Sequence, residues 1–217
     1  MTEITQISHE YPFPTGPQLA NGDEQLFKAA WDHASVRGRG IGTMFLAGFG
    51  SLWLAAGLWD ALQNGWIVGA VAVAGSLLFL AGRNHYRRHA LYALPSDLQT
   101  RFDALRAKGQ RMFHLVNVLQ WVSIIAVNSY LNYIGKSAWS VAAVMLIVGL
   151  HFLPLARLFR SVSHAIVGGI IILLAVSYPF VAAGGPQSPL GPIVMGLILW
   201  GSAAGMLAGA KRTLAQR

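Results

Sequence analysis

Long apolar stretches separated by short polar segments dominate the chain. Six of them lie at 41–62, 66–82, 112–134, 139–159, 164–183 and 190–210. Each is close to the ~20 residues that a helix needs to cross the hydrocarbon core of a bilayer. None alternates between apolar and polar residues as the strands of a membrane barrel do. Because helices satisfy their own backbone amides in lipid, the pattern predicts an all-α, polytopic bundle of six transmembrane helices.

Two amphipathic patterns lie outside these stretches. In the N-terminal tail, 1–40, apolar residues recur at helical spacing from Asp23 to Val36 and predict a short helix, either on the membrane surface or packed under the bundle. In the loop 83–111, Ser96 is expected to cap a second helix that runs to Ala107. The proline-rich segment 8–19 favours an extended chain, and 211–217 forms a C-terminal tail.

The composition narrows the class of protein. Hydrophobic residues make up 54% of the chain and charged residues 11%, whereas an ordinary soluble domain has about 45–50% and about 25%. The chain contains no cysteine, which excludes disulfides and thiolate chemistry. The first forty residues contain no apolar run long enough for a cleavable signal, so we expect the stretch 41–62 to direct membrane insertion.

The cations are distributed unevenly between the two sides of the expected bundle. If the helices alternate in direction, fifteen of the sixteen Lys and Arg residues fall on one side: Lys28, Arg37, Arg39, Arg83, Arg87, Arg88, Arg101, Arg106, Lys108, Arg111, Arg157, Arg160, Lys211, Arg212 and Arg217. Only Lys136 falls on the other side. Because short basic loops stay in the cytoplasm, both termini are expected there. The basic loop 83–111 is expected to bind anionic lipid, and nucleic acid is not an expected partner.

Polar residues gather on one face of the expected helix at 112–134. At 100° per residue they fall within an arc of about 120°. They are His114, Asn117, Gln120, Trp121, Asn128 and Asn132. Lipid offers amides no hydrogen-bond partners, so this polar stripe is expected to face protein or water.

His151 and Pro154 mark a second candidate position. The short connection 135–138 makes the third and fourth helices antiparallel neighbours and places Asn117 and His151 at one depth. Pro154 cannot donate a hydrogen bond to the carbonyl of Leu150, which predicts a kink beside the imidazole. His151 is then either a proton-sensitive or ligand-binding point, or a neutral side chain that donates one hydrogen bond between helices.

Two further features concern the outer face and helix packing. Asp60 either attracts cations to an entrance or marks a helix end in contact with water. Gly201, Gly205 and Gly209 recur every fourth residue, a spacing typical of close helix contacts. We expect them to contact Ala165 and Gly169 of the same chain, and a contact between two chains is the alternative.

Catalytic motifs are absent from the sequence. It has no His-Glu-x-x-His motif and no nucleophile elbow, and the run Ile-Gly-Lys-Ser at 134–137 lacks the first glycine of a phosphate loop. His114, His151 and His164 do not share the spacing of a metal site on one helix. We therefore expect no enzyme activity, no metal and no cofactor.

One segment carries a family resemblance. The run Gly-Leu-His-Phe-Leu-Pro-Leu-Ala-Arg-Leu-Phe at 149–159, together with Arg-Gly-Arg-Gly at 37–40, resembles a family of small uncharacterised bacterial integral membrane proteins. The resemblance implies a location in the bacterial inner membrane, and it implies no activity.

Two classes of function remain. We favour a small-solute permease or channel in which the polar stripe and His151 line a hydrated path. The alternative is a non-transporting accessory, sensory or assembly subunit, in which the stripe contacts another helix. A second copy of the chain or another membrane protein is a partner that both classes leave open.

Overall fold

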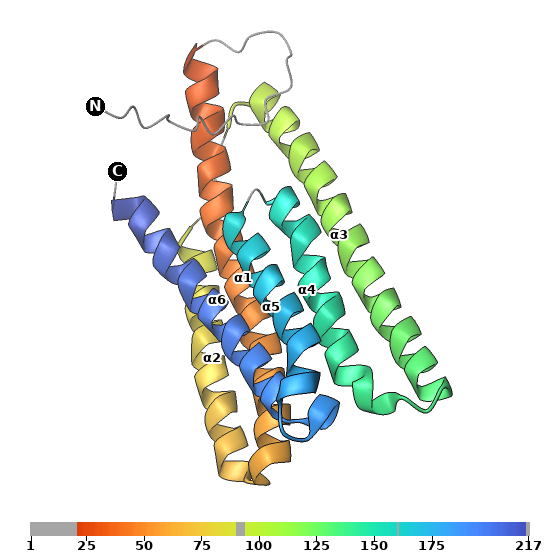
Figure 1. The fold of residues 1–217 in the computed structure, drawn as a ribbon. Coiled ribbons are helices and arrows are strands. Elements are labelled where there is room, and N and C mark those ends of the chain that lie inside the picture. Colours follow the sequence, from red (N-terminus) through yellow and green to blue (C-terminus); the bar gives the residue numbers. More distant parts are fainter. Residues whose placement is uncertain (1–20, 90–93, 160, 216–217) are drawn as a thin grey trace, which may run out of the picture.

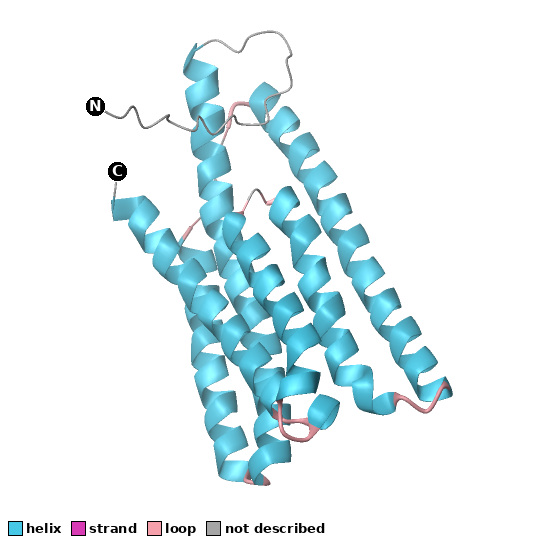
Figure 2. Cartoon of the chain, viewed as in Figure 1, coloured by secondary structure: helices cyan, strands magenta, loops and turns pink. Residues whose placement is uncertain are grey.

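The chain is a helical bundle in the computed structural model, which describes residues 21–89, 94–159 and 161–215 (Figure 1). Its long helices are α1 (Asn21–Leu62), α2 (Gly65–Arg88), α3 (Ser96–Tyr133), α4 (Ser140–Leu158), α5 (Val162–Val181) and α6 (Leu190–Ala215). Two short 3₁₀ helices, η1 (Ser137–Trp139) and η2 (Gly185–Gln187), lie in connections. Figure 2 shows helices joined by short loops throughout the described part.

The predicted fold class is confirmed. Within the described ranges, six helices are long and apolar enough to cross a membrane. The chain is therefore an integral, multi-pass membrane protein that contacts the lipid bilayer. The proline-rich segment 8–19, Arg160, Arg217 and the side chains of Lys211 and Arg212 lie outside the described residues.

The two short helices expected outside the membrane are not separate elements. The segment 23–36 belongs to α1, and the segment 96–107 belongs to α3. No proline interrupts either junction, and each of the glycines there costs the helix only ~1 kcal/mol. The expected cap at Ser96 is also wrong, because Ser96 is the first helical residue, Pro95 occupies the cap position, and no side chain caps this end.

The beginnings of α1 and α3, which prolong the two spanning helices, pack against each other. The rings of Phe27 and Phe102 meet edge to face with centroids 5.6 Å apart, and Trp31 contacts Phe102 in the same way at 6.0 Å. Ala30 is buried in the same cluster. The beginning of α1 is thus held by a second helix, beyond the ends of α4 and α5 in Figure 1. It does not lie as a separate helix on the membrane surface.

Facing glycines set the close contacts between helices. The pairs are Gly40 with Gly82 between α1 and α2, Gly50 with Gly196 between α1 and α6, and Gly149 with Gly168 between α4 and α5. A Cβ on Gly196 would lie 2.7 Å from the carbonyl oxygen of Gly50, and one on Gly168 would lie 2.9 Å from that of Gly149. These distances leave no room for a side chain, so backbone meets backbone as is usual in membrane helix packing.

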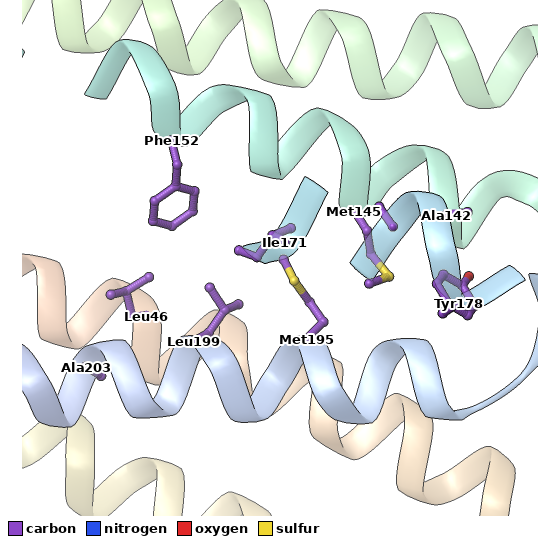
Figure 3. Close-up of a cluster of buried hydrophobic side chains, with 10 residues drawn as sticks. Leu46, Ala142, Met145, Phe152, Ile171, Tyr178, Met195, Leu199 and Ala203 are labelled. Carbon is purple, nitrogen blue, oxygen red and sulfur yellow. The ribbon is translucent and has the colours of Figure 1, made fainter. Parts of the chain in front are cut away.

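The core lies where α4 and α5 meet α1 and α6. Met145 of α4, Ile171 of α5 and Met195 of α6 point toward one another in Figure 3, and each is fully buried. Among the described residues, the buried polar side chains outside this apolar cluster are Thr43 and Ser188. The middle of the bundle is therefore filled with apolar side chains.

The third helix is the outlier of the bundle. α3 contacts α4 beyond its first turns and touches α1 at its beginning, and it lies at the edge of the bundle in Figure 1. In its most apolar 18-residue window, 0% of the residues are buried, against 28% in the corresponding windows of α4 and α5. Most of α3 is therefore available to lipid or to another protein.

Candidate functional site

The polar stripe of α3 divides between two environments. Asn117, Gln120 and Asn128 are half-buried toward α4. His114, Trp121 and Asn132 are exposed, and the exposed fraction of Trp121 is 53%. Helical geometry places Ile125, also exposed, on the same side as these three residues. We call His114, Trp121, Ile125 and Asn132 the outer α3 face.

The two half-buried asparagines bond to their own helix. The Nδ2 of Asn117 donates to the carbonyl oxygen of Phe113 at 2.8 Å, and the Nδ2 of Asn128 donates to that of Ile124 at 2.9 Å. Each acceptor lies four residues earlier, so one donor per amide is satisfied without a neighbouring helix. The sequence contains the signal for this arrangement, because an asparagine inside any helix has such a carbonyl within reach.

Other members of the polar stripe lack this local solution. The side chains of His114, Gln120 and Asn132 make no hydrogen bond to any described residue, and His114 only meets the ring of Phe113 at a centroid distance of 6.0 Å. Gln120 lies in the middle of the span, where an unpaired polar group is costly, whereas His114 and Asn132 lie near its two ends. These three side chains therefore have unused hydrogen-bonding capacity.

His151 of α4 lies beside α3, next to Val116. Its ring is half-buried on α4 and comes within hydrogen-bonding reach of the backbone of Val116, next to Asn117. Its Nδ1 atom is buried and has no hydrogen-bond partner in the described part of the chain. The amide of Asn117 bonds to Phe113 instead, so no described hydrogen bond joins Asn117 to His151. Pro154 lies within α4 and is exposed.

Sequence reasoning missed an aromatic cluster around His164. The Nδ1 of His164 lies 2.7 Å from the Oγ of Ser161. Its ring also lies 6.0 Å from that of Phe152 and 5.6 Å from that of Phe159, and Phe159 in turn lies 6.0 Å from Phe113 of α3. The cluster joins α3, α4 and α5 beside the turn between α4 and α5. Its residues come from separate helices, so no single periodic pattern reveals it.

Asp60 lies at an exposed helix end. It is exposed in the last turn of α1, where the side-chain Nε2 of Gln63 donates to the carbonyl of Trp59 at 2.9 Å. Asn64 then accepts a hydrogen bond from the Trp66 amide, also at 2.9 Å, and so begins α2. These contacts complete the turn between two helices. The predicted entrance role of Asp60 stays a prediction.

The glycines of α6 do not make the contact expected within the chain. Gly201 and Gly205 are exposed, and a Cβ on either would meet nothing within 4 Å among the described residues. The same holds for Gly169, while a Cβ on Gly209 would lie 3.6 Å from the guanidinium of Arg39. The contact of α5 uses Gly168 instead, one residue and about 100° away from Gly169.

The end of the bundle beside the basic residues holds a cluster of cationic and aromatic groups. Arg37 Nη2 donates to the hydroxyl of Tyr86 at 2.6 Å, and its guanidinium lies 4.2 Å from that ring's centroid. His85 Nε2 lies 3.0 Å from the carbonyl oxygen of Val36. The rings of His85 and His89 lie at a tilt to each other, with centroids 4.5 Å apart. Burial lowers the pKa of His89, and the nearby His85, His33 and Arg88 lower it further.

No metal cluster emerges from these contacts. In the described ranges, no group of three or more His, Asp or Glu side chains is placed to hold a metal ion. Comparison of the chain with protein-family models, with curated proteins and with solved structures found no match. The arguments for function therefore come from the chain itself.

Proposed function

We propose that this membrane protein is a non-transporting accessory or assembly subunit, and that the outer α3 face is the surface by which it binds another membrane protein. The observation that carries the proposal is the combination of exposure and polarity on α3. A spanning helix whose most apolar window has 0% of its residues buried also presents His114 and Asn132 outward. Lipid chains give such groups no partner, whereas a neighbouring helix does.

The free energy of each hydrogen bond is small, and these free energies add up along the helix. A hydrogen bond between membrane helices contributes about 0.6–2 kcal/mol. His114 and Asn132 mark the two ends of the outer α3 face, and Trp121 and Ile125 supply apolar contact area between them. Polar groups that fix register around an apolar centre suit a specific helix contact.

The permease or channel hypothesis has weaker support. A hydrated path needs polar walls, but the buried side chains between α4, α5 and α6 are apolar, as at Met145, Ile171 and Met195. The asparagines of the polar stripe use a donor on their own helix. Transport would therefore have to run along the α3–α4 contact, beside His151.

The setting of the subunit is part of the proposal. We place both termini in the cytoplasm, because fifteen of sixteen cations would then lie on that side. The resemblance of 149–159 supports a bacterial inner membrane, and the basic loop 83–111 supports contact with anionic lipid. We propose no catalytic activity, metal or cofactor for this chain.

Photo-crosslinking in native membranes tests the proposal. A photoreactive phenylalanine analogue replaces Trp121 or Ile125 on the outer α3 face, and Leu77 of α2 serves as the control. The exposed fraction is 64% for both Ile125 and Leu77, so exposure is matched. We expect one discrete crosslinked product from the α3 positions and none from Leu77. Crosslinks to lipid alone from all three positions would contradict the proposal.

Cysteine replacement separates the two functions. Because the chain has no cysteine, Gln120→Cys, Asn128→Cys and Asn132→Cys each introduce one thiol. In the accessory role, α4 shields the thiols at 120 and 128 from a membrane-impermeant maleimide, and a helix docked on the outer α3 face shields the thiol at 132. Labelling of all three in native membranes would favour a water-filled path and would count against the accessory role.

A further inference from the structure

A shallow groove opens between α4 and α5 beside the turn that joins them. Its volume is about 500 Å³. It is lined by Leu153, Ala156 and Arg157 of α4 and by Ser161, Val162 and Ala165 around the start of α5. Val162 has an exposed fraction of 75% and Leu153 of 40%, so the groove opens on the outer surface of the bundle.

The groove follows from how the two helices are packed. Their backbones are in contact at Gly149 and Gly168, where neither position has room for a Cβ. Toward the turn, the buried side chain of Phe152 lies between the helices, with the ring of His164 6.0 Å from it. Aromatic side chains thus fill one side of the diverging pair. The opposite side has no aromatic residue and is lined by small and aliphatic side chains together with Arg157, and this is the side that stays open.

The groove is apolar within the span and polar at its end. Leu153 and Ala165 lie deeper in the spanning helices, whereas Arg157 and Ser161 lie at the boundary where α4 ends and α5 begins. A phospholipid in a bilayer has the same order, with its acyl chains inside and its phosphate at the boundary. A transmembrane helix of a partner protein would present apolar residues at both depths and would leave the arginine unpaired.

The charge at the boundary is positive. Arg157 is exposed and makes no ion pair or hydrogen bond to any described residue. α5 begins here, and the hydroxyl of Ser161 does not cap it, because that oxygen lies 2.8 Å from Ser163 Oγ and 2.7 Å from His164 Nδ1. The positive end of the α5 dipole therefore adds to the guanidinium.

From the groove, its depth and its charge together, we infer that this is a specific site for an anionic phospholipid. One acyl chain lies between Leu153 and Ala165, and the phosphate meets Arg157 at the beginning of α5. The headgroup contacts both α4 and α5, so the lipid is bound beside the turn that joins them. This site is independent of the proposed role of α3, which rests on the residues of the outer α3 face.

Native mass spectrometry of the full chain tests the site. The protein, released from detergent, is supplied with equal amounts of phosphatidylglycerol and phosphatidylcholine, and the copies of each that stay bound are counted. We expect the unaltered chain to retain one phosphatidylglycerol in preference. Arg157→Gln should lower that preference about fivefold, which corresponds to the ~1 kcal/mol that one cation contributes beside anionic lipid. Ala165→Trp should remove the bound copy by filling the groove.

Matched controls lie outside the groove. Lys136→Gln removes an exposed cation of the loop after α3, which has no assigned lipid contact, and Ala204→Trp enlarges an exposed small residue of α6. Both should retain lipid as the unaltered chain does. An unchanged thermal unfolding midpoint shows that each variant is folded, and Val162→Trp replaces Ala165→Trp if the latter is not folded.

Three results would overturn the inference. The unaltered chain would retain phosphatidylcholine as readily as phosphatidylglycerol, or the variants Arg157→Gln and Ala165→Trp would retain lipid unchanged. The third such result would be that Ala165→Trp abolishes a dimer peak and leaves bound lipid unaffected, which would assign the groove to a second copy of the chain.

Discussion

Two asparagines illustrate how single polar residues are tolerated in this membrane protein. Asn117 and Asn128 each donate to a carbonyl four residues earlier, at 2.8 and 2.9 Å. A side chain that is satisfied within its own helix makes little demand on its neighbours. His151 differs from them, because its buried Nδ1 has no described partner.

This difference leads to a prediction about stability. Asn128→Leu should change the free energy of unfolding by less than ~0.5 kcal/mol, because the hydrogen bond it removes is local. His151→Leu should lower stability by less than the ~1 kcal/mol of one hydrogen bond, since the loss of the ring's contact with the Val116 backbone is offset by removal of a buried Nδ1 that has no described partner. Unfolding of the purified variants in detergent measures both effects. A large loss for Asn128→Leu would show that its amide also bonds to a group beyond the described contacts.

His89 supports a prediction about pH. Its pKa is lowered by burial and by the neighbouring His85, His33 and Arg88, so the unfolded chain binds a proton that the folded chain resists. The contribution of His89 to stability is therefore complete above its ordinary pKa near 6.5 and is lost as the pH falls toward the lowered value. Acidification from pH 7.5 to 5.5 should lower the unfolding midpoint of the unaltered chain more than that of His89→Gln. Equal decreases in the two proteins would contradict the prediction.

At the scale of elements, facing glycines decide which helices touch. Gly50 and Gly196 bring α1 and α6 together, whereas Gly201 on the same α6 faces open space. The two α6 positions are five residues apart, so they lie on different sides of one helix. A contact of this kind depends on which side of the helix a glycine occupies, beyond its recurrence in the sequence.

A matched pair of variants tests this dependence. Gly196→Ile should destabilise the bundle by about 1–3 kcal/mol, because its side chain must displace the backbone of α1. Gly201→Ile adds the same side chain to the same helix and should have little effect. Thermal unfolding in detergent compares them. If Gly201→Ile proved equally damaging, an unseen partner or second copy would have to occupy that side.

Helix packing also shows where sequence reasoning succeeds and where it stops. The spanning stretches were predictable because an apolar run of about twenty residues has few alternatives in lipid. The continuity of 23–36 with the first spanning helix was not predictable, because Phe102, which lies far away in the sequence, holds the beginning of α1. Likewise the spacing of Gly201, Gly205 and Gly209 indicates a seam, but only the rotation of α6 decides whether anything lies against it.

For the molecule as a whole, the main question is how the bundle sits across the membrane. The positive-inside rule predicts that both tails and the α4–α5 turn face the cytoplasm. Lys136→Cys, in the loop after α3, should then react with an impermeant thiol reagent in intact cells, and Arg83→Cys should react only after the cells are opened. The opposite pattern would invert the topology and remove the cytoplasmic assignment of the basic loop.

The order in which the helices leave the ribosome gives the α1–α6 contact a further consequence. α1 packs along both α2 and α6, so α1 finds one neighbour soon after it is synthesised and the other only after α2, α3, α4 and α5 have been made. Until then, the surface around Gly50 has no helix from its own chain to lie against it. A truncated product that lacks α6 would carry this surface uncovered, and the cell's quality-control proteases would have a means of distinguishing it from the finished protein.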